Sequence, residues 1–139
     1  MEYKKIGFIG LGLIGGSIAK AIKETAPDTE IYGHASHIET IREAYDAGVI
    51  KNSNMLSLSD FGDMDIIFLC CPVRANVKYL NEIKQHLSPD CLLTDVGSVK
   101  GEITNEVKKL GLLRQFIGGH PMTGSEKTGF SNSSPQLLE

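Results

Sequence analysis

The chain has 139 residues, a formal net charge of −3 and 41% hydrophobic residues, enough for one domain with a substantial core. This balance gives no indication of a nucleic-acid or membrane-surface partner, and no apolar run reaches the roughly 18 residues of a membrane span. The N-terminus shows no basic and apolar leader. We therefore expect a cytoplasmic protein whose three cysteines are reduced, buried thiols, with no metal site.

Short apolar runs alternate with helical patterns from the N-terminus to about residue 118. The runs are continuous, as expected of parallel strands that are buried on both faces. The predicted strands are 6–9, 30–33, 65–70, 91–94 and 115–117, and the predicted helices are 15–24, 37–47, 76–87 and 99–110. Residues 51–63 are polar and predict a loop with a short helix. The alternation predicts an α/β fold of the Rossmann type, with a doubly wound, mainly parallel sheet and helices on both faces.

The first strand and the first helix are joined by Gly10-Leu11-Gly12-Leu13-Ile14-Gly15. A G-x-G-x-x-G run between a strand and a helix is the fingerprint of dinucleotide binding. Gly10 would permit the tight turn, Gly12 would let the backbone approach a pyrophosphate, and Gly15 would let the helix pack close to the strand. The free N–H groups at the start of the helix would then face the phosphates.

The predicted cofactor-binding residues lie at the carboxyl ends of the strands, where such sheets bind their ligands. They are Gly10, Gly12, Leu13, Ile14, Gly15, Ala35, Ser36, His37, Cys71, Pro72, Val73 and Gly97. An acidic residue that binds the adenosine ribose is expected about 20 residues beyond the fingerprint, but residues 33–37 contain no carboxylate. Without it, the 2′-hydroxyl loses a partner and a 2′-phosphate meets no repulsion, so Ser36, His37 and Arg42 could accommodate NADP.

Two further motifs follow the last two predicted strands, at residues 95–100 and 118–126. Ser98 stands where a helix cap is expected. His120 lies between a glycine pair and a proline, where it could brace the turn or, as a neutral imidazole, accept a proton from a substrate hydroxyl. In the second case, Ser98 could hydrogen-bond the other ring nitrogen and fix the tautomer.

Together, Gly-Leu-Gly-Leu-Ile-Gly-Gly-Ser at 10–17, Asp-Val-Gly-Ser-Val-Lys at 95–100 and Gly-Gly-His-Pro-Met-Thr-Gly-Ser-Glu at 118–126 resemble the prephenate dehydrogenase family, which includes arogenate dehydrogenases. The resemblance covers the whole chain. It implies oxidative decarboxylation of prephenate to 4-hydroxyphenylpyruvate in tyrosine biosynthesis, with a nicotinamide accepting the hydride, and it favours NAD over NADP. The residues that match the family's catalytic positions are His120, its orienting serine Ser98, the acidic Glu126 at the site entrance, and the substrate-loop residues Gly124 and Ser125.

Residues 123–139 are rich in Gly, Ser, Thr, Asn and Pro and show no periodicity. They predict a loop-like tail after a dinucleotide-binding domain at 1–122. The family usually continues into a helical C-terminal domain that dimerises and supplies an arginine for the substrate carboxylates. We therefore expect the full-length protein to be a homodimer that binds a small-molecule substrate. The 139-residue chain would be monomeric or weakly associated, and inactive or weakly active.

Two alternatives remain: another dehydrogenase with a similar N-terminal domain, and a protein of a different class. A 3-hydroxyacid dehydrogenase or a pyrroline-carboxylate reductase would share the N-terminal domain, but neither is expected to carry the His-Pro-Met-Thr-Gly-Ser-Glu loop. A nucleotide-binding module without activity of its own is the other alternative, and a turnover assay distinguishes it from an enzyme. The sequence leaves the choice between prephenate and arogenate, and any feedback by tyrosine, open.

Overall fold

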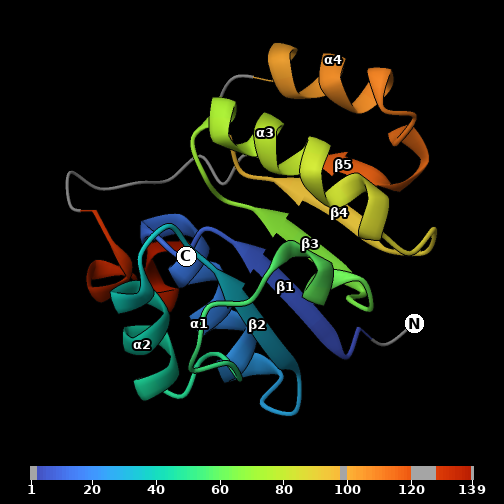
Figure 1. Cartoon of the computed structure of the whole chain (residues 1–139). Coiled ribbons are helices and arrows are strands. Elements are labelled where there is room, and N and C mark those ends of the chain that lie inside the picture. The colour runs from blue at the N-terminus through green and yellow to red at the C-terminus, as the bar shows by residue number, and fades with distance from the viewer. Residues whose placement is uncertain (1–2, 98–99, 120–127, 139) are drawn as a thin grey trace.

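Figure 1 shows the computed structural model of the chain, which describes residues 3–97, 100–119 and 128–138. Within these residues, five parallel strands form one sheet in the order β2-β1-β3-β4-β5. The strands are β1 (Lys5–Ile9), β2 (Glu30–His34), β3 (Ile66–Leu69), β4 (Leu92–Asp95) and β5 (Phe116–Gly118). The helices are α1 (Leu13–Thr25), α2 (Ile38–Asp46), α3 (Val73–Ile83) and α4 (Gly101–Lys109). The predicted Rossmann-type fold is confirmed.

Different helices cover the two faces of the sheet (Figure 1). α1 and α2 enclose one apolar cluster with residues such as Phe8 and Ile41, and α3 and α4 enclose a second one with Leu80 and Ile103. Phe8 also stacks on Phe68 of the neighbouring strand, with ring centroids 4.8 Å apart. Helices on both faces leave most residues of β1, β3 and β4 buried or half-buried, which explains why these strands are continuous apolar runs rather than alternating ones.

The chain after α2 runs along the outer edge of β2 before it returns to β3. The backbone N–H of Lys51 donates to the carbonyl of Ile31 at 2.8 Å. The buried Asn52 side chain accepts from the N–H of Gly33 at 2.9 Å and donates to its carbonyl at 3.0 Å. The chain therefore moves outward twice, from β1 to β2 and from β2 to this edge. Right-handed crossovers place both α1 and α2 on the same face of the sheet.

All four helices begin at other residues than the sequence predicts. α1 begins at Leu13 rather than at residue 15, and α2 begins at Ile38 rather than at residue 37. α3 begins at Val73 rather than at residue 76, because Pro72, whose fixed φ suits a helix start, occupies its N-cap. α3 ends at Ile83, and a 3-10 turn over Lys84–His86 follows. α4 begins at Gly101 with Lys100 as its N-cap residue, so the cap lies two positions beyond Ser98, the residue expected there.

The buried face of α1 consists of small residues, namely Gly15, Gly16, Ser17 and Ala19. Ile18 and Ile22, which have the apolar spacing of a helix, are only half-buried against the α1–α2 cluster. A Cβ on Gly15 would collide with the carbonyl oxygen of Gly10. The apolar periodicity therefore located the helix but not the face with which it meets the sheet.

The described part of the tail is packed against the domain. It contains two 3-10 turns, η4 (Phe130–Asn132) and η5 (Pro135–Leu138), and both lie against α1. Phe130 is only 4% exposed and belongs to the α1–α2 cluster, a contact that the composition of the tail did not indicate. Among the residues that the structure describes, no helix is long and apolar enough to cross a membrane.

Candidate functional site

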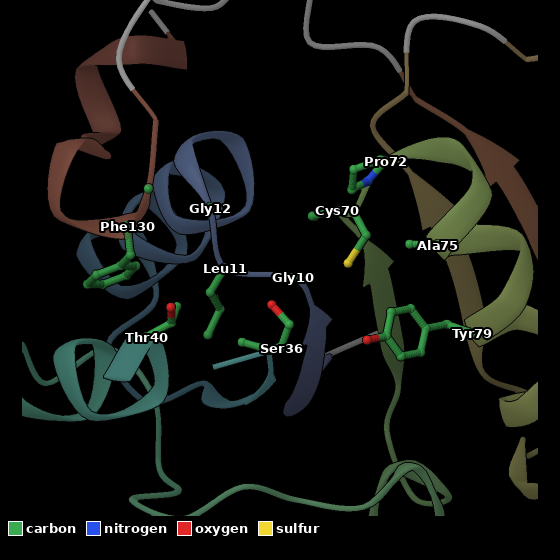
Figure 2. A pocket seen from close by; sticks show the side chains of 13 residues that line it. Gly10, Leu11, Gly12, Ser36, Thr40, Cys70, Pro72, Ala75, Tyr79 and Phe130 are labelled. Carbon is green, nitrogen blue, oxygen red and sulfur yellow. The ribbon is translucent and has the colours of Figure 1, made fainter. Parts of the chain in front are cut away.

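A pocket of about 300 Å³ opens at the carboxyl ends of β1 and β3 (Figure 2). From β1 the chain crosses to β2 at one edge of the sheet, whereas from β3 it crosses to β4, toward the other edge. Open α/β sheets bind ligands at such a topological switch point. The pocket is lined by Gly10, Leu11, Gly12, Ala35, Ser36, Thr40, Cys70, Cys71, Pro72, Ala75, Tyr79, Gly129 and Phe130.

The glycine turn after β1 forms one side of the pocket. Gly10 has a φ of +100°, and a Cβ there would lie 2.8 Å from Sγ of Cys71 and 2.9 Å from the carbonyl oxygen of Cys70. A Cβ on Gly12, by contrast, would meet no atom within 4 Å. Gly12 is also the N-cap residue of α1 and makes no side-chain cap. The first N–H groups of the helix are therefore available to an anion that enters beside Gly12.

The turn from β3 into α3 forms the opposite side. Asn76 is buried and holds this turn, because its Oδ1 accepts from the N–H of Cys71 at 3.0 Å and its Nδ2 donates to the carbonyl of Leu69 at 3.4 Å. The Tyr79 ring meets the His34 ring edge-on, with centroids 5.4 Å apart. Nδ1 of His34 lies 2.9 Å from the carbonyl oxygen of Leu56. His34, which the sequence did not single out, does not line the pocket but packs against Tyr79, which does.

The end of β2 supplies the third part of the lining. Ala35 is 9% exposed and packs with the α1–α2 cluster, while Ser36 is exposed. Thr40, in the first turn of α2, completes this part of the pocket. None of these side chains is acidic, and none of the residues that line the pocket is charged. A fold of this type is expected to carry an acidic side chain that binds the ribose of the cofactor. No such side chain occurs among the described residues that line the pocket.

The structure brings together half of the residues that the sequence predicted for cofactor binding. Those that line the pocket are Gly10, Gly12, Ala35, Ser36, Cys71 and Pro72, and those that do not are Leu13, Ile14, Gly15, His37, Val73 and Gly97. The lining residues that were missed are Leu11, Thr40, Cys70, Ala75, Tyr79, Gly129 and Phe130. Ala75 and Tyr79 lie four residues apart on one helix face after Pro72, a spacing from which they could have been found. No sequence signal indicated Phe130.

An ion pair joins the ends of β4 and β5. The Asp95 carboxylate is 1% exposed at the end of β4, and Nζ of Lys100 lies 2.8 Å from both of its oxygens. Lys100 also donates to the carbonyl of Gly119, just after β5, and the N–H of Gly97 donates to Asp95 Oδ2 at 3.2 Å. Asp95 and Gly118 are partners in the parallel register. The pair therefore ties together the two strand ends that precede the predicted catalytic motifs.

The predicted catalytic and substrate-loop residues lie outside the described residues. They are Ser98, His120, Gly124, Ser125 and Glu126.

The three cysteine thiols are protonated at neutral pH. Burial raises the pKa of Cys71 to about 11 and that of Cys91 to about 12. Burial also raises the pKa of Cys70, and the neighbouring Cys71 and Asp95 add to this effect. Only a thiolate is an effective nucleophile. The cysteines of the pocket, Cys70 and Cys71, therefore act as small apolar lining groups rather than as reactive ones.

The raised pKa of Cys71 predicts a pH dependence of alkylation. The thiolate is the minor species at every pH below about 11, so the rate of Cys71 labelling by iodoacetamide should rise about tenfold per pH unit from pH 7 to 10. Peptide mass spectrometry at timed intervals measures this rate. Free glutathione is the control, because its rate levels off near its own, lower pKa. Labelling of Cys71 at pH 7 as fast as that of glutathione would contradict the assignment.

The chain matches the family model described as "Prephenate dehydrogenase, nucleotide-binding domain" over residues 18–139. Prephenate dehydrogenase of Lactococcus lactis is 40% identical over 140 residues, which cover 98% of this chain and 39% of that protein. The crystal structure of Aquifex aeolicus prephenate dehydrogenase in complex with hydroxyphenyl propionate and NAD⁺ is 33% identical with a TM-score of 0.91, covering 100% of this chain and 49% of that one. Synechocystis arogenate dehydrogenase is 32% identical with a TM-score of 0.84, covering 96% and 46%.

This chain thus spans less than half the length of each of these relatives. The match to the family model begins within α1 and includes β2, β3, β4 and β5. The Aquifex structure superimposes over the whole chain, including the glycine turn before α1. The chain therefore belongs to the prephenate dehydrogenase family and corresponds to its nucleotide-binding domain.

Proposed function

We propose that this chain binds a nicotinamide dinucleotide in the pocket at β1 and β3, as part of an enzyme that oxidatively decarboxylates prephenate to 4-hydroxyphenylpyruvate in tyrosine biosynthesis. The observation that carries the proposal is the open space in front of Gly12, beside the uncapped N-terminus of α1 and at the switch point of the sheet. A pyrophosphate fits this place because it needs close approach to the backbone and free N–H donors. Membership of the family supports the same function.

In this proposal, each part of the pocket holds a different part of the cofactor. Gly10, Gly12 and Gly15 shape the turn, and the N–H groups of Leu13 and Ile14 at the start of α1 donate to the pyrophosphate. Ala35, Ser36 and His37 follow β2 and flank the adenosine ribose. Cys71, Pro72 and Val73 flank the dinucleotide from the β3 side, and Gly97 follows β4 toward the nicotinamide.

The reaction chemistry is proposed for the two motifs after β4 and β5. The nicotinamide, when bound, accepts the hydride. His120 accepts a hydrogen bond or the proton from the ring hydroxyl of the substrate, while Ser98 orients its imidazole. Glu126, Gly124 and Ser125 border the substrate. The register supports this assignment, because Ser98 follows Asp95 by three residues and His120 follows its partner Gly118 by two.

The whole protein is proposed to be a cytoplasmic homodimer that acts on a small molecule, without a nucleic-acid or membrane partner. In this view residues 1–122 bind the dinucleotide and residues 123–139 lead toward a helical C-terminal domain. The relatives support this organisation because each is more than twice as long as the part that this chain matches.

Oxidation of arogenate is the second candidate function, since one of the structural relatives is an arogenate dehydrogenase. The two activities differ only in the substrate, and both need the dinucleotide site described above. Steady-state rates of the full-length protein with prephenate and with arogenate decide between them. Production of NAD(P)H from neither substrate would overturn both.

The first prediction from the proposed function tests the dinucleotide site through Gly12→Val. The valine side chain would fill the space that a pyrophosphate needs, so binding of NAD⁺ and NADP⁺ should fall below detection in calorimetry. The fold should be kept, because a Cβ at Gly12 meets no atom within 4 Å. Gly101→Val is the matched control, since Gly101 begins α4 and its Cβ also meets nothing within 4 Å. Unchanged affinity of the Gly12→Val chain would refute the pyrophosphate assignment.

The second prediction concerns the choice between NAD and NADP. A carboxylate at the end of β2 would bond a ribose 2′-hydroxyl and repel a 2′-phosphate. Ala35→Asp should therefore shift the ratio of the two dissociation constants at least about tenfold toward NAD. Ala35→Asn is the control, because it adds a side chain of the same size without the charge. If both variants leave the ratio as it is in the parent chain, position 35 does not face the ribose.

The third prediction concerns catalysis by the full-length protein. His120→Asn should lower kcat by about 10²- to 10⁴-fold, the usual effect of losing a positioned acid or base, with little change in the dissociation constant of the cofactor. Ser98→Ala should cost less, because it removes only the orienting bond. The two losses should not multiply in the double variant, since the residues would act as one unit. Near-normal kcat in His120→Asn would remove the histidine from the mechanism.

A further inference from the structure

Residues 128–134, which we call the strap, are wedged against α1 near the glycine turn. The Phe130 side chain is 4% exposed and lies over Gly16, one residue after the last fingerprint glycine. A Cβ on Gly16 would be 2.7 Å from Oγ of Ser133 and 2.8 Å from Cδ2 of Phe130. The absence of a side chain at Gly16 is therefore what lets the strap approach the helix.

Polar contacts hold the strap in this position. Nζ of Lys20 donates to the carbonyl of Ser133 at 2.8 Å and to that of Phe130 at 3.4 Å. The same ammonium group lies 4.4 Å from the centroid of the Phe130 ring, within the range of a cation–π interaction. The N–H of Ser134 donates to Oγ of Ser17 at 3.0 Å. Ser17 and Lys20 of α1 thus bind the strap at Phe130, Ser133 and Ser134.

The strap also borders the pocket at the switch point. Gly129, with a φ of +87°, and Phe130 both line that pocket. Figure 2 shows Phe130 on the side of Gly12 and Thr40, while Pro72, Ala75 and Tyr79 lie across the pocket. The strap therefore lies beside the glycine turn and away from β4 and β5 (Figure 1).

We propose that the strap is a wall of the dinucleotide site and that Phe130 is a positioning residue for the adenosine-diphosphate half of the cofactor. This inference rests on the proposed function. The ring anchors Gly129 beside the turn, and this apolar edge keeps water from one side of the bound pyrophosphate. Hydrogen bonds from the first N–H groups of α1 are stronger where water is excluded.

The first test displaces the strap without changing a group that lines the pocket. Gly16→Ala places a methyl group against Ser133 and Phe130, and Gly101→Ala is the control because its Cβ has no neighbour within 4 Å. Calorimetric titrations with NAD⁺ and with ADP-ribose should both show a dissociation constant raised roughly 10-fold in Gly16→Ala. The control should match the parent chain. The loss should be equal for both ligands, because the strap lies away from the nicotinamide side.

The second test compares two buried phenylalanines. Phe61 is 0% exposed and packs in the α3–α4 cluster, against the position of a Cβ on Gly7 in β1, and it does not line the pocket. Phe130→Leu and Phe61→Leu should both lower Tm, but only Phe130→Leu should weaken NAD⁺ and ADP-ribose binding. Phe130→Tyr, which keeps the ring, should bind NAD⁺ and ADP-ribose with nearly the affinity of the parent chain.

The outcomes separate this inference from the function on which it rests. If the parent chain binds neither NAD⁺ nor NADP⁺, the proposed function fails. A different outcome is that the parent chain binds, while Gly16→Ala and Phe130→Leu, both folded at the titration temperature, bind NAD⁺ and ADP-ribose as tightly as it does. In that case the strap is only a structural support and this inference is wrong. A loss seen with NAD⁺ but not with ADP-ribose would likewise overturn the assignment to the adenosine-diphosphate half.

Discussion

The close approach of α1 to the carboxyl end of β1 is the constraint on which the rest of the site depends. A side chain at Gly15 would collide with the carbonyl of Gly10, and a side chain at Gly10 would meet Cys70 and Cys71 at the end of β3. With glycine at both positions, the first turn of the helix begins directly at the edge of the sheet. The partial positive charge of that helix end therefore reaches the switch point, where a crossover on each side leaves room for a ligand.

Two sets of contacts between residues far apart in the sequence, which we call ties, stabilise the segments around this switch point. The Asp95–Lys100 pair, extended to the carbonyl of Gly119, joins the ends of β4 and β5. The Asp95 carboxylate is buried, and the ammonium group of Lys100 together with the N–H groups of Gly97 and Gly119 offsets the cost of burying its charge. The strap is the second tie, and it connects residues near the C-terminal end of this chain to α1. One tie lies beside the proposed reaction chemistry and the other beside the proposed cofactor pyrophosphate.

Much of the fold could be predicted from the sequence because its signals are local. Five apolar runs and the helical patterns between them lie within a few residues of the observed elements, and the glycine turn has the expected close contact at Gly15. The errors of the prediction lie mainly at the ends of helices, where single residues change the start of the helix. Pro72 starts α3 earlier than the apolar spacing indicated, and the polar contacts of Lys100 accompany a later start of α4. On the buried face of α1 the sequence indicated Gly15 but not Gly16, Ser17 and Ala19, because small side chains carry only a weak apolar signal.

The sequence by itself determined the alternation of strands and helices, the anion-binding turn and the lack of a carboxylate after β2, because each depends on neighbours within a few residues. Only the tertiary structure decided which side chains enclose the pocket. Tyr79 arrives there by the register of β3 with β1 and by the pitch of α3, and Phe130 arrives because Gly16 leaves space for its ring. The residues of such contacts lie far apart along the chain. Their meeting follows from the packing of whole elements, for which no short sequence pattern exists.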